Sequence, residues 1–388
     1  MINVIDGLDT QALEQIKKTV EADIDSGLYD GASIIVARHG KIGLNASLGW
    51  SNREEKRKTQ SNDIYTIFSM TKAFTNFLVL QAIDKGYLSL MTKVVEIIPE
   101  FYGRDRFRTS RKDKITVGHL LTHRAGLVST PTPIDYSELG DFKKVIDAIC
   151  QLDVTGEPGV TQNYSPTLNH SLLAEMVRRV YKADSIAQLM QEKLFEPLGM
   201  ESSSLGLPNK FKNRHVPVKV KFPDGQWLKV SDIEIMNEII NEKAEMPWVG
   251  AVSSINDIFK FTEMLRQGGT YEGSRLLSPA IIDFATQNHT GSKPHDLYIT
   301  LAESRGWEVP PANMGLGFAL GGSGFAPSYF GPLVSERTYG NYGAGSTLFW
   351  VDPKRDLTFI CLTSGVLEES ENILRFQKLS TLAVASAN

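Results

Sequence analysis

The chain has 388 residues, of which 41% are hydrophobic and 22% charged, and its formal net charge at pH 7 is −4. This composition is typical of a soluble globular protein with enough apolar residues for a large core, in one domain or two lobes. The slightly acidic charge lacks the basic signature of a nucleic-acid-binding protein, and no apolar run approaches the length of a membrane span. The two cysteines, Cys150 and Cys361, are far apart in sequence and predict buried free thiols.

The first half of the chain predicts a helix, a hairpin and a helical block. Residues 10–27 have the spacing of an amphipathic helix that ends at Gly27. Residues 32–37 and 42–48 predict two strands joined by a turn at His39-Gly40. A β-rich approach at 64–68 leads into a helix over 72–85, and the pattern from 73 to 201 is mostly helical, with loops at 102–114 and 126–140.

The second half predicts a return to strands. Residues 205–248 are irregular, as in long excursions that border a binding cleft. A helix over 255–267, strands at 348–351 and 357–363, and a last helix over 370–385 follow. This order predicts an α/β (α+β) fold, with an antiparallel sheet flanked by the terminal helices and an inserted, mostly helical lobe. We expect a discontinuous α/β lobe of residues 1–75 and 245–388, and a mainly helical lobe of residues 76–244 with active-site loops.

The one Ser-x-x-Lys tetrad of the chain, Ser69 to Lys72, lies at the start of a predicted helix. Backbone N–H groups point outward from a helix start, and a lysine three residues after a serine lies on the same helical face. This spacing can place an amine beside a hydroxyl, and a desolvated amine has a lowered pKa and can act as a base. The alternative is a serine helix cap followed by a surface lysine.

Two further segments carry groups suited to the same chemistry. Tyr164 lies on a loop before a predicted helix over 168–181, and a phenol near a lysine ammonium has its anionic form favoured, so it can take a proton from serine. The alternative for Tyr164 is a loop anchor. The glycine-rich residues 339–345 allow close backbone approach, and an N–H there could join that of Ser69 in an oxyanion hole; the alternative is a simple hairpin.

Three more segments complete a pattern: residues 115–127, residues 194–200, and residues 250–254 with Asp257. Together with the tetrad and the two segments above, they resemble the serine β-lactamase-like superfamily. The branch resembled holds class C β-lactamases, D-alanyl-D-alanine carboxypeptidases, and the family VIII carboxylesterases and acyltransferases. The resemblance runs from about residue 10 to residue 385, and it implies the fold of that superfamily.

The resemblance also implies roles for individual residues. Ser69 matches the acylated nucleophile, Lys72 its activating partner, and Tyr164 the general base that then acts as an acid. The N–H groups of Ser69 and Ala344 match the oxyanion hole. No metal and no cofactor are implied.

The substrate contacts that we expect follow the same resemblance. Asn341, Tyr342 and Gly343 occupy the place of the family's third motif, which binds substrate. Tyr136 and Trp248, and with them Tyr329 and Phe330, are candidate aromatics of the cleft wall, with core or surface packing as the equal alternative for each.

Two departures from the family pattern bear on the substrate. Pro166 stands where β-lactamases and peptidases carry an asparagine that binds a substrate amide, and proline offers no donor there. Asn341 replaces a cationic residue that meets a substrate carboxylate, and a neutral amide cannot supply that charge. Both changes argue against penicillin-like or D-Ala-D-Ala substrates and are compatible with neutral esters, although Arg337 is close enough in sequence to supply a charge instead.

The sequence therefore predicts a serine hydrolase that acts through a covalent acyl-enzyme, with carboxylesterase activity on neutral esters. The alternatives are an acyltransferase that uses a small-molecule acceptor, a β-lactamase or D-amino-acid peptidase or amidase, and a catalytically silent binding protein. The partners that we expect are a small-molecule ester or acyl donor and, for a transferase, an acceptor, with no nucleic acid.

The first residues do not resemble a signal peptide, so a cytoplasmic location is expected. His119 and His123 are four residues apart, but no third metal ligand is evident, and the oligomeric state is left open.

Overall fold

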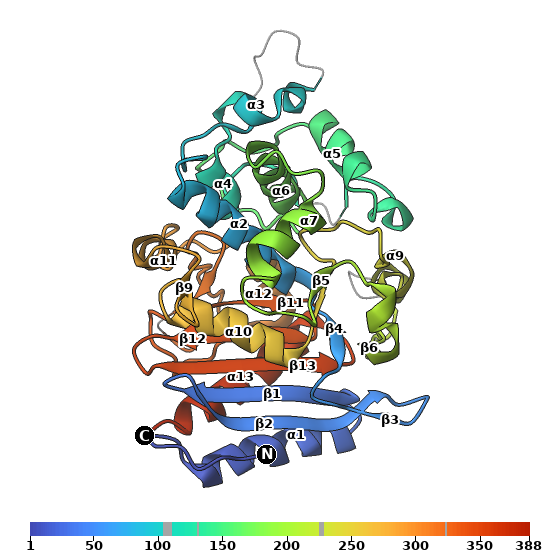
Figure 1. The fold of residues 1–388 in the computed structure, drawn as a ribbon, viewed down its shortest axis with the longest axis vertical. Helices are drawn as coiled ribbons and strands as arrows, with labels where there is room; N and C mark the ends of the chain where they lie inside the picture. The colour runs from blue at the N-terminus through green and yellow to red at the C-terminus, as the bar shows by residue number, and fades with distance from the viewer. Residues whose placement is uncertain (104–110, 130–131, 225–228, 323) are drawn as a thin grey trace.

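The centre of the molecule is an antiparallel sheet of seven strands in the order β10-β11-β12-β13-β1-β2-β3 (Figure 1). The computed structural model describes residues 1–103, 111–129, 132–224, 229–322 and 324–388. The strands are β1 (Gly31–Arg38), β2 (Lys41–Asn52), β3 (Arg57–Lys58), β10 (Ala319–Leu320), β11 (Tyr339–Gly343), β12 (Thr347–Asp352) and β13 (Leu357–Ser364). The predicted hairpin is confirmed, and both residues of its turn, His39 and Gly40, have positive φ, as a two-residue turn between twisted strands requires.

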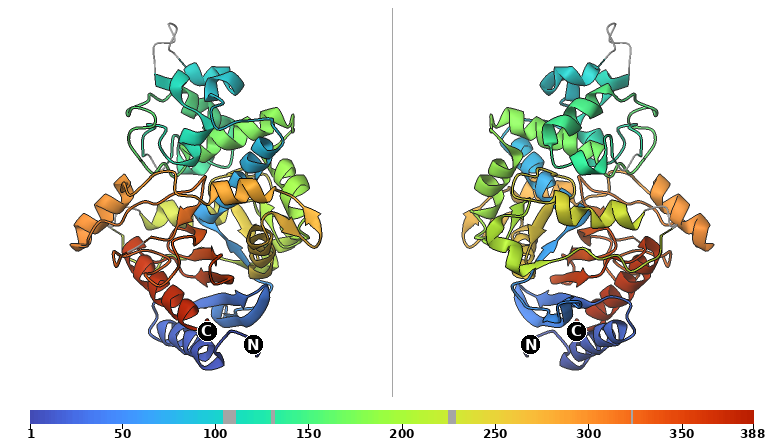
Figure 2. Two further views of the ribbon diagram at one scale, coloured as in Figure 1. Left: turned by 90° about the vertical axis from the view of Figure 1, so that its left-hand side faces the viewer. Right: turned by 90° about the vertical axis from the view of Figure 1, so that its right-hand side faces the viewer.

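Helices cover both faces of this sheet. The terminal helices α1 (Thr10–Asp25) and α13 (Glu369–Ala385) share one core cluster with Ile34 and Val36, whereas Ile35 belongs to the cluster that includes α10 (Ile255–Arg266). Because neighbouring residues of a strand point to opposite faces, the two clusters lie on opposite sides of β1. The two ends of the chain meet beside α1, where the backbone N–H of Asn388 donates to the carbonyl of Gly7 (3.0 Å; Figure 2).

A group of helices stands over one edge of the sheet (Figures 1 and 2). It consists of α2 (Lys72–Asp84), α3 (Val94–Ile97), α4 (Val117–Leu121), α5 (Phe142–Gln151), α6 (Leu168–Val180) and α7 (Ile186–Met190). Every side chain of α2 from Lys72 to Ala82 is buried, so this helix runs through the interior. The predicted fold class is confirmed. The proposed boundary between residues 75 and 76 falls inside α2, and the division into two lobes stays a prediction.

A second, small sheet holds the approach to Ser69 in place. Its strand order is β5 (Ser204–Leu205), β7 (Ala251–Ser253), β4 (Ile64–Thr66) and β6 (His215–Val216). Two of these strands lie in the excursion predicted to be irregular, which also contains α8 (Val230–Glu234) and α9 (Met236–Ile239). Residues 225–228 of that excursion, and parts of the predicted loops at 102–114 and 126–140, lie outside the described residues.

The sequence patterns missed two helices and a short hairpin between α10 and β10: α11 (Pro279–Ala285), α12 (Asp296–Arg305), β8 (Thr270–Tyr271) and β9 (Ser274–Arg275). Helix α12 mixes polar and apolar residues without a clear apolar stripe, so periodicity does not reveal it. Its start is capped by His295, whose Nδ1 accepts from the backbone N–H of Tyr298 (3.2 Å).

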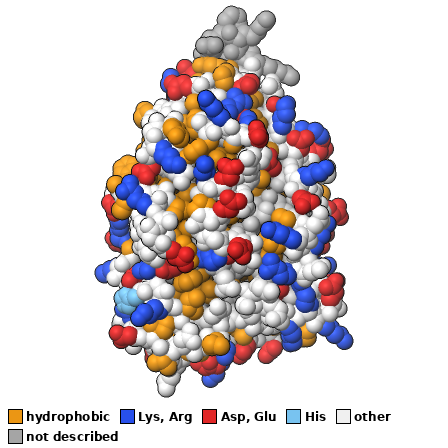
Figure 3. Space-filling model, in the orientation of Figure 1, with side chains coloured by type: hydrophobic (Ala, Val, Ile, Leu, Met, Phe, Trp, Pro, Cys, Tyr) orange, Lys and Arg blue, Asp and Glu red, His pale blue; other side chains and the backbone are white. Residues whose placement is uncertain are grey.

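The surface carries both signs of charge. On the face shown in Figure 3, acidic and basic side chains are interspersed among apolar ones over the described residues. None of the described helices combines the length and the apolarity that a membrane crossing needs.

Candidate active site

Ser69 lies in a tight turn between β4 and α2. The turn is the 3-10 helix η1 (Phe68–Thr71), and the α-helix begins at Lys72, as predicted. Ser69 therefore lies in the turn just before the α-helix and not in its first turn. Phe68 has a φ of 47°, which a non-glycine residue adopts only at a cost of about 1–3 kcal/mol. Its side chain is only 4% exposed, and burial of the ring stabilises this backbone conformation.

Lys72 is placed one turn later, with its amine against the serine. Its Nζ lies 2.8 Å from Ser69 Oγ and donates to the carbonyl of Trp248 (3.0 Å). The residue is only 3% exposed, and burial lowers the pKa of Lys72 to about 7, because the protonated amine loses its hydration. Near neutral pH a large fraction of this amine is therefore uncharged and carries a free lone pair beside Ser69.

Tyr164 approaches Ser69 from the loop before α6. Its hydroxyl donates to Ser69 Oγ (3.2 Å), and its backbone N–H donates to Asp296 Oδ1 (2.7 Å). Burial raises the pKa of Tyr164 to about 12, and the hydrogen bond to Ser69 opposes this only in part. The prediction that a nearby lysine would favour the phenolate is therefore wrong, because burial outweighs the amine, whose Nζ lies 5.6 Å from the ring centre. At neutral pH Tyr164 is a neutral phenol and a hydrogen-bond donor.

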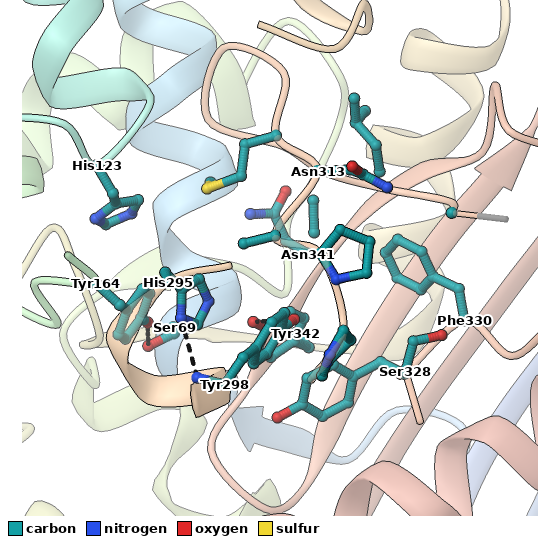
Figure 4. A pocket seen from close by; sticks show the side chains of 18 of the residues that line it. Ser69, His123, Tyr164, His295, Tyr298, Asn313, Ser328, Phe330, Asn341 and Tyr342 are labelled. Carbon is teal, nitrogen blue, oxygen red and sulfur yellow. Dashed lines mark hydrogen bonds between the residues drawn. The ribbon is translucent and has the colours of Figure 1, made fainter. Parts of the chain in front are cut away.

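These three residues line one narrow cavity, which offers about 80 Å³ to the centres of water-sized molecules (Figure 4). Aromatic side chains form one wall: the rings of Tyr329 and Tyr342 stack at 3.8 Å between centres, and the hydroxyls of Tyr298 and Tyr342 are 3.1 Å apart. Further lining residues include three histidines, His123, His170 and His295, and the side chains of Asn313, Met314, Phe330 and Asn341. Among the described lining residues there is no arginine and no carboxylate, so Lys72 is the one lining group that carries a full charge at neutral pH when protonated.

The third motif brings strand β11 against the serine turn. Asn341 and Tyr342 line the cavity, whereas Gly343 faces η1: a Cβ on Gly343 would lie 2.3 Å from the carbonyl oxygen of Ile67. The hydroxyl of Thr347 donates to the same carbonyl (2.9 Å). Ala344, which follows Gly343, packs half-buried against the core. Glycine at 343 is therefore the residue that lets the backbone of β11 come this close to the turn that carries Ser69.

Three residues considered for substrate contact do not line the cavity. The Trp248 side chain is buried in the core, 2% exposed, and only its carbonyl reaches the site, through Lys72. Tyr136, in η4 (Tyr136–Glu138), packs against the core of the helical block. Arg337 does not supply a charge to the site, because its guanidinium pairs with Asp283 (2.7 Å) at the surface.

A separate groove lies on the other side of Tyr164. It is larger, about 680 Å³ by the same measure, and it shares Tyr164 with the cavity. Pro166 and residues of α12, Asp296, Leu297 and Thr300 among them, line it. Pro166 therefore borders this groove and not the cavity around Ser69.

Two histidines of the site were missed from the sequence. His123 and His295 pack on the ring of Tyr164, at 4.9 and 5.7 Å between ring centres. Burial lowers the pKa of each, well below the usual value for His123 and to about 4 for His295. Two neutral rings therefore hold Tyr164 in place. The loop that carries His295 has no periodic pattern, whereas His123 lies inside the family segment 115–127, and that position was the one signal of a place near the site.

No metal site is evident around the histidines. The ring of His119 faces the backbone N–H of Thr116 (Nδ1 at 3.4 Å), whereas His123 turns toward the cavity. In the part of the chain that the structure describes, no group of three or more His, Cys, Asp or Glu side chains is placed to hold a metal ion.

Residues 16–382 match the family described as Beta-lactamase. Among curated relatives, the chain is 29% identical over 210 residues to Protein flp of Staphylococcus aureus (strain NCTC 8325 / PS 47), a match that covers 54% of this chain and 41% of that protein. It is 25% identical over 392 residues to N-acetylmuramyl-L-alanine amidase of Bacillus subtilis (strain 168), covering 94% of this chain and 84% of that protein. The matched region thus spans less than half the length of the first relative.

Solved structures share the fold over nearly the whole chain. EstCE1, described as a hydrolase with promiscuous acyltransferase activity, superposes with a TM-score of 0.78 at 20% identity, covering 96% of this chain and 99% of that one. A family VIII carboxylesterase superposes with a TM-score of 0.75 at 21% identity, covering 98% and 100%. The resemblance found in the sequence is confirmed by these matches.

Proposed function

Because this chain belongs to the beta-lactamase family, we propose that it is a serine hydrolase that forms an acyl-enzyme on Ser69 and hydrolyses neutral carboxylic esters. The observation that carries the proposal is the convergence of two groups on one hydroxyl: Lys72 Nζ at 2.8 Å and the Tyr164 hydroxyl at 3.2 Å from Ser69 Oγ. A base, a nucleophile and an acid within hydrogen-bond reach are the parts that acyl transfer needs.

In the acylation step, Ser69 Oγ attacks the ester carbonyl carbon while its proton passes to the neutral amine of Lys72. Lys72 suits this role because burial holds its pKa at about 7, whereas Tyr164, with a pKa of about 12, stays protonated. The carbonyl π electrons move to oxygen and form an oxyanion. We assign its stabilisation to the N–H groups of Ser69 and Ala344, since β11 packs against η1 at Gly343.

Collapse of the tetrahedral intermediate breaks the bond to the leaving alcohol. Tyr164 donates its proton to that oxygen and recovers one from the ammonium of Lys72, so the amine and the phenol return to their starting states. A water molecule then attacks the acyl carbonyl while its proton moves to Lys72. The bond from the acyl carbon to Ser69 Oγ breaks, and the ammonium of Lys72 returns that proton to Oγ, so Ser69 leaves as the hydroxyl. Each proton that is removed from a nucleophile is thus returned to a leaving group.

The cavity wall supports a neutral substrate. Its described lining residues offer no arginine, and Lys72 already hydrogen-bonds to Ser69 and to the Trp248 carbonyl, so no free cation awaits a carboxylate. The family VIII carboxylesterase among the structural relatives supports the same substrate class by analogy.

A second candidate is acyl transfer to an alcohol other than water. The groove that shares Tyr164 with the cavity favours it, because an acceptor held there would lie beside the group that we assign to proton transfer at the leaving oxygen. The description of EstCE1 supports this candidate by analogy. Adding a small alcohol to an ester assay distinguishes the two: transfer yields a new ester, whereas hydrolysis yields only the free acid.

The test is release of p-nitrophenol from p-nitrophenyl butanoate by the wild type, Ser69→Ala and Ser137→Ala. Ser137 is an exposed serine in the 3-10 helix η4 and serves as the matched control. We expect Ser69→Ala to lose turnover and labelling by a fluorophosphonate, with Ser137→Ala unaffected in both. Equal turnover by Ser69→Ala, or failure of the folded wild type to be labelled, would overturn the proposal.

A further inference from the structure

We propose that the cavity selects esters whose acyl portion carries a hydrogen-bond donor, a hydroxyl or an amide N–H, and that Asn341 is the residue that reads it. The inference rests on the proposed function and deepens it. Asn341 is 9% exposed and lines the cavity with Ser69, yet its Oδ1 has no hydrogen-bond partner among the described residues (Figure 4).

The orientation of the Asn341 amide follows from its other end. Its Nδ2 donates to the carbonyl of Gly317 (3.1 Å), and a backbone carbonyl can only accept. Turning the amide over would put two acceptors against each other, so the nitrogen faces Gly317 and Oδ1 is the end left over. The end of Asn341 that has no partner at the cavity lining is therefore an acceptor.

The Gly317 carbonyl is itself held firmly. It accepts a second hydrogen bond from Asn76 Nδ2 (2.7 Å), and the N–H of Gly317 donates to the carbonyl of Leu121 (3.0 Å). Gly317 has a φ of +80°, and a Cβ there would lie 2.2 Å from Asn76 Cγ, so glycine is required for this contact. The amide of Asn341 is thus anchored through the backbone of Gly317, which the buried side chain of Asn76 holds in place.

The same chain of hydrogen bonds leaves a second buried acceptor without a donor. Asn76 Oδ1 lies 2.9 Å from His170 Nε2, and because this oxygen can only accept, the proton of His170 is on Nε2. Burial holds the pKa of His170 well below its usual value, so the ring is neutral and its Nδ1 carries a lone pair. His170 lines the cavity, and its Nδ1 has no partner among the described residues.

Two buried acceptors without donors favour a donor on the ligand. Leaving such a group unsatisfied costs about 1–3 kcal/mol, and a hydroxyl or amide N–H of a substrate removes that cost. A carboxylate would meet two lone pairs instead of a cation and is disfavoured. The donor belongs to the acyl portion because Tyr164, which we assign to the leaving alcohol, borders the second groove as well, whereas Asn341 borders only the cavity.

The experiment compares kcat/KM for four p-nitrophenyl esters: butanoate, its 2-hydroxy and 3-hydroxy analogues, and succinate, which carries a carboxylate. We expect at least one hydroxy ester to exceed butanoate on the order of tenfold, and succinate to fall below butanoate. Asn341→Leu should bring the hydroxy esters and butanoate to within about twofold of each other. Asn313→Leu is the matched control: Asn313 lines the same cavity, but its Oδ1 already accepts from Asn288 (3.2 Å), so the preference should persist.

Equal kcat/KM for the hydroxy esters and butanoate in the wild type, or an unchanged preference in Asn341→Leu, would overturn the inference while hydrolysis itself stands. If Asn341→Leu does not fold, the kcat/KM ratios of the wild type for the hydroxy esters and butanoate decide the question. If a water molecule satisfied Asn341 Oδ1, a substrate hydroxyl would bring no advantage and the ratios would be close to one. Absence of turnover for all four esters, with no fluorophosphonate label on Ser69, would instead refute the proposed function.

Discussion

The buried amine of Lys72 should make the stability of the protein depend on pH, and Lys72→Met should remove that dependence. Burial lowers the pKa of Lys72 from the ordinary 10.5 to about 7. Since one pKa unit corresponds to about 1.4 kcal/mol, keeping the amine protonated in the folded state costs on the order of 5 kcal/mol.

The sign follows from which state binds the proton. Between pH 7 and 10.5 the unfolded chain holds this proton and the folded protein does not, so raising the pH through that window stabilises the fold. Below pH 7 both states are protonated, and the full cost is present. Methionine fills a similar volume without a charge; it leaves the Trp248 carbonyl without its donor, a loss of about 1–3 kcal/mol that does not vary with pH.

The assay is denaturant unfolding of the wild type, Lys72→Met and Lys18→Met at pH 6, 7, 8 and 9. From pH 7 to pH 9 we expect the free energy of unfolding of the wild type to rise by about 2 kcal/mol relative to Lys72→Met, since the folded amine is already half deprotonated at pH 7. Taking the difference cancels every titrating group that the two variants share. Lys18→Met removes the same charge from the exposed face of α1 and controls for net charge. If the free energy of unfolding changed with pH in the same way for the wild type and Lys72→Met, burial would not depress the pKa of Lys72. That result would contradict the assignment of Lys72 as the base.

Two further predictions concern the catalytic step. We expect kcat/KM to rise with pH and level off above an apparent pKa of about 7, because only neutral Lys72 can accept the serine proton. A flat profile from pH 5.5 to 8.5 would contradict this. A second ester with an equally activated leaving group should give the same apparent pKa, which shows that the titration belongs to the enzyme. We expect Gly343→Ala to lower kcat about 10²–10³-fold, since its Cβ would lie 2.3 Å from the Ile67 carbonyl and would push β11 away from the serine turn. Gly140→Ala, whose Cβ would come no closer than 3.4 Å to a neighbour, should keep its activity, and equal rates in the two variants would argue against an oxyanion hole at Ala344.

Local sequence patterns were sufficient for much of the architecture. The terminal helices have apolar residues at helical spacing, whereas β1, β12 and β13 are short apolar runs that are buried almost throughout; both signals are properties of neighbours in the chain. Helix α12 was missed because it has no such stripe, and the short strands β5 and β6 were missed because pairing with β4 and β7, far away in sequence, is what forms them.

For the candidate site as well, some properties follow from the sequence and others only from the tertiary structure. The sequence by itself determined the residue types and their order: a serine and a lysine one turn apart, a tyrosine before a helix, and an asparagine where related proteins carry a cation. Only the tertiary structure decided their chemistry. Burial sets the pKa of Lys72 and of Tyr164 in opposite senses for catalysis, and it depends on residues from the whole chain.

The same holds for what surrounds Ser69. His295 and Asn313 reach the cavity from the segments on either side of α12. Trp248 contributes a carbonyl and not its ring, and the unpartnered end of Asn341 is its oxygen because Gly317 holds its nitrogen. Each of these facts is a distance between residues remote in sequence. Spacing along the chain reports on contacts within one helix or strand, whereas burial and hydrogen-bond partners at this site arise only when the sheet, the helical block and the loops meet.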